Sequence, residues 1–359
     1  MGFTEAVRTA VGALFRLLPF STEPGLRIFG QPDESSPVFV TANFDLTVKR
    51  VMRYLKNLDC YLLVAPTGGI NVWCAAKGGN FTAHSVISVV KTSRISNKVT
   101  NRTLLLPQLA APGVDTELVR RETGWRCKFG PVYAKDIPEY IANGLEKTDD
   151  MRRVKWSFID RLDVGIGVSF PVFLLILVIL AVFLSDWLTE FAILGVGVLL
   201  VMYGLYPFIP GKAGWHKLLF LETLIGIGLL SYIFLSADPS VYVRGLLFMA
   251  MGLVAVIGGD FGGVTPLYKS DLDPLLDNIG IRRIGPVDFR GRAKIIGGKI
   301  VLDQTKCTAC GICYDVCPRG VFEMERNEHK MMVIQYPELC EACEACVLQC
   351  PPKAISFGS

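Results

Sequence analysis

The chain of 359 residues contains four apolar runs in succession, and these runs constrain its fold more than any other feature. They cover residues 164–185, 191–211, 218–237 and 239–259. The first two carry no charged residue, and each of the others carries one. A helix of about 20 apolar residues crosses roughly 30 Å of hydrocarbon. One such run could be a buried helix of a soluble protein, but four in succession predict a transmembrane domain of four helices over residues 161–260.

The charges beside these runs predict their orientation. Basic residues lie before the first run, between the second and third, and after the fourth, whereas the two alternate loops carry only acidic charges. The basic residues are Arg152, Arg153, Lys155, Arg161, Lys212, Lys217 and Lys269, and the acidic ones are Asp186, Glu190 and Asp238. The positive-inside rule then places both soluble ends in the cytoplasm. We therefore expect a multi-pass protein of the cell inner membrane, with its four spans in contact with membrane lipid.

Residues 1–160 alternate between strand-like and helix-like segments. The strand-like runs are 38–42, 61–65, 103–106 and 126–132, and the helix-like runs are 46–58, 81–90 and 115–122, with Asp115 as an N-cap. This alternation predicts an α/β domain with a parallel sheet, so that the whole chain combines multidomain α/β structure with an all-α membrane part. Ligands of such sheets bind at the carboxyl ends of the strands.

The overall charge argues against nucleic acid as a partner. Charged residues make up only 19% of the chain and the formal net charge is +4, so the sequence offers no large basic face for phosphates. Residues 261–301 are rich in Gly, Pro and charged residues and predict a linker, whose length would leave the following module, residues 302–359, mobile relative to the membrane.

Eight of the eleven cysteines form two copies of the spacing C-x2-C-x2-C-x3-C-P in this C-terminal module. In this spacing three thiolates hold one [4Fe–4S] cluster while the fourth reaches the other cluster. We assign Cys307, Cys310, Cys313 and Cys350 to the first cluster, and Cys340, Cys343, Cys346 and Cys317 to the second. Zinc is the alternative, but tetrahedral zinc sites use paired C-x2-C units and need neither the third cysteine nor the proline-marked fourth.

Between the two cysteine motifs, residues 321–324 and 331–335 flank a polar turn around Asn327 and predict a small hairpin. The module resembles bacterial-type two-cluster ferredoxins over its whole length. This resemblance implies a carrier of single electrons.

Residues 71–79 form an unusual segment around a lone cysteine. They read Asn-Val-Trp-Cys-Ala-Ala-Lys-Gly-Gly and follow a strand and a Gly68-Gly69 turn. A lone Cys in an apolar segment is usually a small buried hydrophobe. Here the small neighbours leave room beside Cys74 for a large flat ligand at the carboxyl edge of the sheet, and a thiolate there can bind a soft or borderline metal in that ligand.

At these residues the chain resembles the mercury-methylation corrinoid proteins, joined in one chain to their ferredoxin partner. The resemblance extends over residues 36–43, 69–74, 106–109, 111–113 and 130–136. Together with the apolar runs and the ferredoxin-like module, it covers nearly the whole chain. The α/β part is also similar to the corrinoid domains of the corrinoid iron–sulfur proteins of the acetyl-CoA pathway.

The resemblance implies that Cys74, on a short cap helix, is the catalytic residue and the lower axial ligand of the cobalt in a cobamide. It further implies cofactor contacts by Thr41, Thr47, Asn71, Val72, Trp73, Ala75, Ala76 and Ala134. Ordinary structural roles compete with several of these contacts. The two threonines could end a strand and begin a helix, Trp73 could belong to the core, and Ala134 could be a packing residue.

A thiolate is a stronger donor to cobalt than imidazole, and it favours departure of a bound methyl group as a carbanion equivalent. We therefore expect a membrane-anchored methyltransferase that moves a methyl group from methyl-cobalt to inorganic Hg(II), while the ferredoxin module reduces the corrinoid to Co(I). The partners that the resemblance implies are a methyl-donor methyltransferase or a methyltetrahydrofolate-type donor, and an upstream low-potential electron donor.

Two departures from the family put mercury as the acceptor in question. The family signature continues C-A-A-G-K-G, whereas Lys77 and Gly78 stand in the reverse order here, and no cysteine follows Cys350 although the family's separate ferredoxin has further ones. Two alternatives therefore stay open. One is a related corrinoid methyl carrier with a non-mercury acceptor, and the other is a non-catalytic, membrane-bound electron-transfer ferredoxin.

Overall fold

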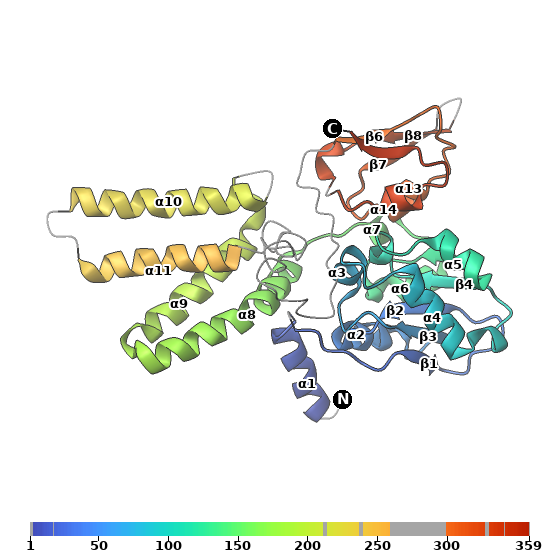
Figure 1. Cartoon of the computed structure of the whole chain (residues 1–359), viewed down its shortest axis with the longest axis horizontal. Helices are drawn as coiled ribbons and strands as arrows, with labels where there is room; N and C mark the ends of the chain where they lie inside the picture. Colours follow the sequence, from blue (N-terminus) through green and yellow to red (C-terminus); the bar gives the residue numbers. More distant parts are fainter. Residues whose placement is uncertain are drawn as a thin grey trace, which may run out of the picture. The chain divides into compact units, whose positions relative to one another are not determined.

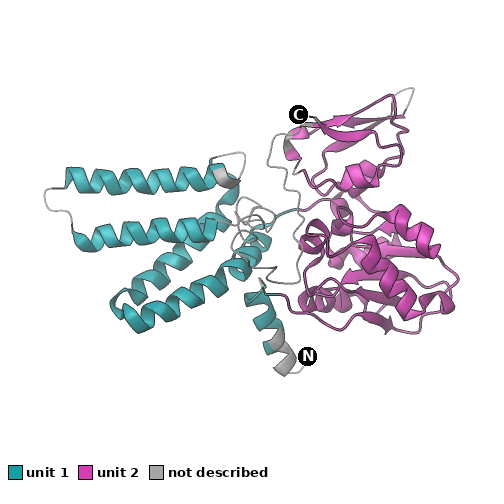
Figure 2. Cartoon of the chain, in the orientation of Figure 1, with its two compact units in different colours: residues 1–18, 155–272 teal, residues 19–154, 273–359 magenta. Residues whose placement is uncertain are grey.

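The computed structural model describes residues 3–16, 18–210, 214–236, 240–258, 299–326, 330–340 and 342–358. The chain forms two compact units (Figure 2). One consists of residues 1–18 and 155–272, and the other of residues 19–154 and 273–359. The predicted linker up to residue 298 and the predicted turn at Asn327 lie outside the described residues. Residues 1–18 belong to the first unit because an N-terminal helix packs against one of the apolar helices.

The first unit is helical (Figure 1). Its helices are α1 (Phe3–Leu14), α8 (Phe158–Phe183), α9 (Leu188–Leu199) with a π-helical extension (Leu200–Gly204), α10 (Gly214–Leu235) and α11 (Val241–Gly258). Helix α1, which the sequence analysis did not predict, packs against α8, where Arg16 pairs with Asp163 (2.5 Å) and Phe15 meets Phe170 edge-on.

Four helices of this unit are long and apolar enough to cross a membrane, in agreement with the four predicted runs. They cover Phe158–Phe183, Ser185–Gly204, His216–Leu235 and Val241–Gly258. Many of their large apolar side chains are exposed, and Phe183, Phe234 and Leu235 are 76%, 80% and 85% exposed. Exposing apolar surface to water costs about 25 cal/mol per Å². Large exposed apolar surfaces mark contacts with other proteins or with a membrane.

The second unit contains a five-stranded sheet of order β1-β3-β2-β4-β5. The strands are β1 (Gly25–Phe29), β2 (Val38–Ala42), β3 (Cys60–Ala65), β4 (Thr103–Leu106) and β5 (Arg126–Phe129). Strands β2 to β5 run parallel, as predicted. The prediction missed β1, which pairs antiparallel with β3 and has only partly buried or exposed residues, so that it shows no apolar run.

Helices cover both faces of this sheet. They are α2 (Asp45–Leu55), α4 (Ala83–Ser93), α5 (Thr116–Thr123) and α6 (Ile137–Ala142). Alternate strand residues enter two separate cores: Val38 and Val40 pack with α4 and α5, whereas Phe39 packs with residues of α2 and α6. Because the parallel strands all end at one edge, the loops that follow β2, β3 and β4 meet there. This edge carries the short helix α3 (Val72–Lys77) and a 3-10 turn (Gln108–Ala110).

The C-terminal domain is a small α+β fold within the same unit. Strand β6 (Lys299–Leu302) pairs antiparallel with β9 (Ile355–Gly358), and β7 (Phe322–Arg326) pairs antiparallel with β8 (Lys330–Ile334), which is the predicted hairpin. Two short helices, α13 (Ile312–Val316) and α14 (Ala345–Gln349), complete it. Each helix begins one residue before the third cysteine of its motif. The repeat in the sequence is therefore also a repeat in the fold.

Candidate functional site

Helix α3 presents Cys74 at the carboxyl edge of the sheet. Asn71 is its N-cap, and the Asn71 side-chain oxygen accepts a hydrogen bond from the backbone N–H of Cys74 (3.0 Å). Ala75 and Ala76 are buried in the core beneath the helix, whereas Cys74 is exposed. The periodicity of the helix therefore buries the small side chains and turns the thiol outward.

A buried hydrogen-bond network fixes the loop that leads into α3. The side-chain oxygen of Asn43, at the end of β2, accepts bonds from the backbone N–H groups of Thr67 and Gly69 (both 2.9 Å). The Asn43 amide nitrogen donates to the carbonyl oxygen of Thr22 (3.1 Å), and the Asn43 backbone N–H donates to the Thr67 hydroxyl (3.2 Å). We call these contacts the Asn43 brace. The sequence analysis did not identify this residue, although it lies inside the 36–43 match.

Close backbone approach also holds α3 in place. A Cβ atom on Gly113 would lie 2.4 Å from the carbonyl oxygen of Phe81 and 2.7 Å from that of Ala76. Gly69 has a φ of +73°, and a Cβ there would lie 2.8 Å from the backbone nitrogen of Ser21. Only glycine fits at these two positions, and the Gly68-Gly69 turn thus sets where the cap helix begins.

The remaining predicted cofactor contacts lie in different environments. Thr41 is buried in β2, Thr47 is partly buried near the start of α2, and Ala134 is partly buried against the core that involves α2 and α6. Val72 is nearly buried and Trp73 is partly buried. These positions agree with either cofactor binding or ordinary packing.

A buried hydroxyl group favours a ligand at this edge. The hydroxyl of Thr41, near the end of β2, finds no hydrogen-bond partner among the described residues. A buried hydroxyl without a partner costs about 1–3 kcal/mol, and a polar group of a bound ligand would offset that cost for Thr41. The exposed thiol and the unsatisfied Thr41 hydroxyl therefore fit a large metal-bearing ligand. Ala75 and Ala76, which the sequence analysis placed at this ligand, instead lie in the core beneath the helix.

The eight cysteines of the C-terminal domain line two separate hollows. The first is lined by Cys307, Cys310, Cys313 and Cys350 among apolar side chains. The second is lined by Cys317, Cys340, Cys343 and Cys346. Each set combines three cysteines of one motif with the last cysteine of the other, which fits the donor set of a [4Fe–4S] cluster. Among the described residues, no three His, Cys, Asp or Glu side chains are grouped as ligands of a single metal ion.

The backbone around the two hollows is nearly duplicated. Ala309 and Ala342 hold equivalent places in the two motifs and have left-handed φ angles of 51° and 48°. Gly311 and Glu344 are likewise equivalent, with φ of 80° and 65°. A left-handed conformation costs a non-glycine residue about 1–2 kcal/mol. Its recurrence at equivalent positions indicates that both loops are shaped to surround the same kind of group.

Backbone N–H groups also point at the sulfur atoms of both hollows. Val321 N–H donates to Cys317 Sγ (3.5 Å), and Ala354 N–H, the equivalent group, donates to Cys350 Sγ (3.2 Å). Burial raises the pKa of the Cys313 thiol to about 12. A bound cluster would hold these sulfurs as thiolates, and the N–H groups would stabilise them.

The C-terminal domain docks on the α/β domain through a buried surface with several hydrogen bonds. The Gln349 amide nitrogen donates to the carbonyl oxygens of Ala111 (2.9 Å) and Val114 (2.7 Å), and its oxygen accepts from the Thr116 hydroxyl (3.0 Å). Apolar residues of α13 and α14, Val316 and Ala345, join the core beneath α4 and α5. We call this contact the docking surface.

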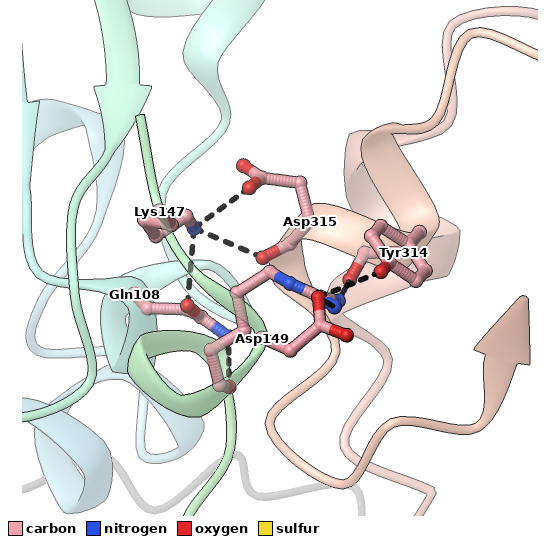
Figure 3. Close-up of polar contacts among 6 residues, drawn as sticks. Gln108, Lys147, Asp149, Tyr314 and Asp315 are labelled. Atoms are coloured by element: carbon pink, nitrogen blue, oxygen red, sulfur yellow. Dashed lines mark hydrogen bonds and ion pairs between the residues drawn. The ribbon is translucent and has the colours of Figure 1, made fainter. Parts of the chain in front are cut away.

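Lys147 and Arg152 extend the docking surface (Figure 3). Lys147 Nζ contacts a carboxylate oxygen of Asp315 (2.9 Å), the backbone oxygen of Asp315 (3.0 Å) and the side-chain oxygen of Gln108 (3.0 Å). The Arg152 guanidinium lies 3.5 Å from the Tyr314 ring centre and donates to the Tyr314 carbonyl oxygen (2.9 Å). Burial lowers the pKa of Lys147 to about 8, although the Asp315 carboxylate opposes that shift.

Helix α3 itself touches the C-terminal domain. Lys77 Nζ lies 3.4 Å from the carbonyl oxygen of Ala342, to which it donates. Burial raises the pKa of the Cys343 thiol to about 11, and the positive charge of Lys77 counteracts part of this rise. The segment that carries Cys74 is thus in direct contact with the loop that lines the second hollow.

Comparison with known proteins separates the chain into two matched parts. Residues 306–355 match the family described as 4Fe-4S dicluster domain. An uncharacterized ferredoxin of Methanocaldococcus jannaschii is 39% identical over 57 residues, which make up 16% of this chain and 74% of that ferredoxin. The C-terminal domain belongs to the two-cluster ferredoxins.

The α/β domain that this ferredoxin domain contacts has relatives of another kind. Residues 16–141 match the family described as CO dehydrogenase/acetyl-CoA synthase delta subunit. The acetyl-CoA decarbonylase/synthase complex subunit gamma of Methanopyrus kandleri is 41% identical over 125 residues, 34% of this chain and 27% of that subunit. The corrinoid/iron-sulfur protein large subunit of Moorella thermoacetica is 33% identical over 130 residues, 36% of this chain and 29% of that subunit.

The chain spans about a quarter of the length of these curated relatives of the α/β domain. A corrinoid/iron–sulfur protein type of domain joined to a ferredoxin domain is therefore confirmed. The relatives carry the names of acetyl-CoA pathway proteins, so the mercury-specific part of the predicted resemblance stays a prediction.

We predict that Asn43→Ala destabilises the α/β domain by about 2–4 kcal/mol, because it leaves two buried N–H donors without an acceptor. Urea unfolding of the purified chain measures this loss. Asn80→Ala is the matched control, since the Asn80 amide donates a single bond, to the Gly78 carbonyl oxygen (3.3 Å). We expect Asn80→Ala to lower the free energy of unfolding by less than about 1 kcal/mol. Equal losses for the two variants would contradict a stabilising role of the Asn43 brace.

We predict that Lys147 makes stability rise between about pH 8 and pH 10.5. The folded chain releases this proton at lower pH than the unfolded chain, whose lysine has the ordinary pKa of 10.5. The cost of burying the charge is therefore fully present below pH 8 and is relieved as the pH rises, by at most roughly 3 kcal/mol. Urea unfolding from pH 7 to 10.5 measures the free energy of unfolding at each pH. We expect it to rise with pH in the unaltered chain and in the control Lys56→Met, which changes an exposed site, but not in Lys147→Met. A parallel pH profile for Lys147→Met and the unaltered chain would contradict this reading.

Proposed function

We propose that this chain is a membrane-anchored corrinoid methyl carrier that is reduced by its own ferredoxin domain. The observation that carries the proposal is the position of Cys74, exposed on a cap helix at the carboxyl edge of the sheet, on the same short helix as a residue that contacts the ferredoxin domain. The named relatives of the α/β domain support the choice of a corrinoid over another flat ligand.

A cobamide, when bound, supplies a cobalt ion that accepts and releases a methyl group and that depends on reduction to stay active. Cys74 would hold this ion as a thiolate, with Asn71 fixing the backbone at the thiol. The buried Thr41 hydroxyl would donate to or accept from a polar group of the ligand, and Ala75 and Ala76 would support the cap helix from the core side. Thr47, Val72, Trp73 and Ala134 are the further proposed contacts.

The two clusters of the ferredoxin domain would supply single electrons to this site. The first would be held by Cys307, Cys310, Cys313 and Cys350, and the second by Cys340, Cys343, Cys346 and Cys317. An upstream low-potential donor would reload them. The methyl group would come from a donor methyltransferase or a methyltetrahydrofolate-type donor.

The four apolar helices would anchor the chain in the cell inner membrane as four spans. The basic residues before the first helix favour cytoplasmic placement of the α/β domain and of the ferredoxin domain. This placement would keep both domains in the compartment that holds low-potential electron carriers and reduced thiols.

For the methyl acceptor, we favour an acceptor other than mercury. The matched family and the Methanopyrus kandleri relative of the α/β domain are named for acetyl-CoA synthase and acetyl-CoA decarbonylase/synthase, and Lys77 precedes Gly78 instead of following it. Inorganic Hg(II) is the second candidate, and the Asn71-Val72-Trp73-Cys74 sequence is the observation that favours it. The alternative without catalysis, an electron-transfer ferredoxin on a membrane anchor, requires that the α/β domain bind no corrinoid.

We predict that the anaerobically purified chain, reconstituted with a cobamide, shows corrin absorption bands and that Cys74→Ala shifts these bands and weakens binding at least tenfold, because the cobalt loses its thiolate donor. Cys127→Ala is the control, since this partly buried thiol belongs to strand β5, away from α3. No corrin bands in the unaltered chain would support the electron-transfer alternative. Identical spectra for the unaltered chain and Cys74→Ala would remove Cys74 from the cobalt.

Methylmercury formation by anaerobic cells separates the two acceptors. If Hg(II) is the acceptor, cells that carry the unaltered chain form methylmercury and cells with Cys74→Ala form at least tenfold less. We expect no methylmercury above background from cells with the unaltered chain or from cells with Cys74→Ala. We also expect corrin bands from the purified unaltered chain. Cys74-dependent methylmercury formation would make mercury the acceptor and overturn our preference.

A further inference from the structure

The two cluster loops of the ferredoxin domain have nearly the same backbone but different surroundings. Cys310 and Cys343 are the second cysteines of their motifs and thus equivalent. Cys310 is exposed, whereas Cys343 is partly buried and packs against the core that the α/β domain shares with α13 and α14. The docking surface therefore breaks the symmetry of the repeat, and it covers the second loop.

A polar contact repeats this asymmetry. The carbonyl oxygen of Ala342, next to Cys343, accepts a hydrogen bond from Lys77 Nζ (3.4 Å). Ala309 is the equivalent residue of the first loop and has the same left-handed backbone. The α/β domain thus contacts the second loop directly through Lys77, whereas Lys147 and Arg152 contact the first motif at helix α13.

Lys77 connects the second loop with the site at Cys74. It lies three residues after Cys74 on the same helix, and residues at this spacing are neighbours on one helix face, with Cβ atoms about 5–6 Å apart. The second loop consequently contacts the cap helix at a residue about one helical turn from Cys74. Because the rate of electron transfer falls steeply with distance, this proximity favours one order of the clusters.

The docking surface also contains buried polar side chains that are hydrogen-bonded. Gln349 is 7% exposed and uses both ends of its amide, while the Lys147 side chain is 3% exposed and contacts three oxygen atoms. Polar groups buried in this way are costly to expose without partners and costly to pair wrongly. The contact between the two domains is thus specific, and the second loop keeps its place beside α3.

We propose that the cluster held by Cys317, Cys340, Cys343 and Cys346 passes electrons directly to the cofactor at Cys74. Lys77 is then the positioning residue, which holds the loop of this cluster against the cap helix. The proposal rests on the proposed function and adds the order of the two clusters. The cluster held by Cys307, Cys310, Cys313 and Cys350, with its exposed Cys310, is then the entrance for electrons from outside.

The electron balance of this order is simple. An upstream low-potential one-electron donor is oxidised as it reduces the entrance cluster. That cluster reduces the second cluster, which is oxidised again when it reduces the cofactor by one electron. No atom changes place in these steps, and a second passage supplies a second electron.

The first test needs no cobamide. The positive charge of Lys77 stabilises the reduced, more negative form of the second cluster, so Lys77→Gln should lower its reduction potential. We expect a roughly threefold change in the redox equilibrium, or about 28 mV at 59 mV per tenfold. The measurement is a redox titration followed by EPR on the full chain in two backgrounds: Cys310→Ser, which spares the second cluster, and Cys343→Ser, which spares the first.

A shift in the Cys310→Ser background and none in the Cys343→Ser background is the expected result. Lys91→Gln, which removes an exposed charge from the same domain, is the matched control and should shift neither potential. Equal shifts of both clusters, or no shift of the second, would overturn the position of Lys77 beside the second cluster. Should Cys343→Ser assemble no cluster, the Cys310→Ser background compared with Lys91→Gln still decides this point.

The second test uses the full chain loaded with a cobamide. After chemical reduction of the clusters, stopped-flow absorption follows the first electron that reaches the cofactor. We expect Cys343→Ser to slow this step at least tenfold more than Cys310→Ser does. Equal slowing by the two variants would overturn the cluster order alone. An unaltered chain whose reduced clusters never reduce its bound cobamide would overturn the proposed function, and this proposal with it.

Discussion

The structure of the second unit depends on the burial of two short helices of the ferredoxin domain against the α/β domain. Val316 and Ala345 supply the apolar part of this contact, and Gln349 supplies a fully satisfied polar part. Apolar burial alone is non-directional and would allow sliding between the surfaces. The buried amide accepts one geometry, because any other leaves its donors or the carbonyl oxygens of Ala111 and Val114 without partners. Gln349 thus helps to set the register between two domains that the sequence separates by the four apolar helices.

The site at Cys74 depends in turn on how the sheet edge is fixed. Asn43 connects the end of β2 with the turn after β3, and Gly113 brings the turn after β4 against α3. Three successive strand ends therefore support one short helix. A helix of six residues is not stable alone, so its orientation comes from these tertiary contacts. This arrangement explains how an exposed thiol can be held with a defined direction.

The sequence predicted those features that follow from local pattern. The strands 38–42 and 103–106 were predicted with their observed bounds, and Asp115 caps α5 as expected, with its side chain accepting from the N–H groups of Glu117 and Leu118. The apolar runs correspond to four helices, and the cysteine spacing led to the ferredoxin domain. In each of these cases the decisive interactions lie within a few residues or repeat with a fixed period.

What the sequence could not predict depends on distant partners. Strand β1 is recognisable only by its pairing with β3, and α1 only by its contact with α8. Nothing in the pattern around Asn43 distinguishes it from a turn residue, since its role lies in bonds to Thr67 and Gly69, more than 20 residues away. The docking surface joins Lys147 to Asp315 across 168 residues. Long-range hydrogen bonds of this kind leave no periodic signal.

The order of Lys77 and Gly78 acquires a physical meaning from the docking surface. In the order found here, the lysine side chain reaches the Ala342 carbonyl oxygen, and Gly78 follows as the C-cap of the helix. A single contact at 3.4 Å is weak by itself. Two domains in one chain, however, meet at a high effective concentration, so weak contacts are enough to select one arrangement. A separate ferredoxin would have to bind through the same surface against the full entropy of association. Because the domains are fused, Lys77, the one basic residue of the cap helix, can serve to position the ferredoxin domain. A different place of this lysine in the motif is then expected.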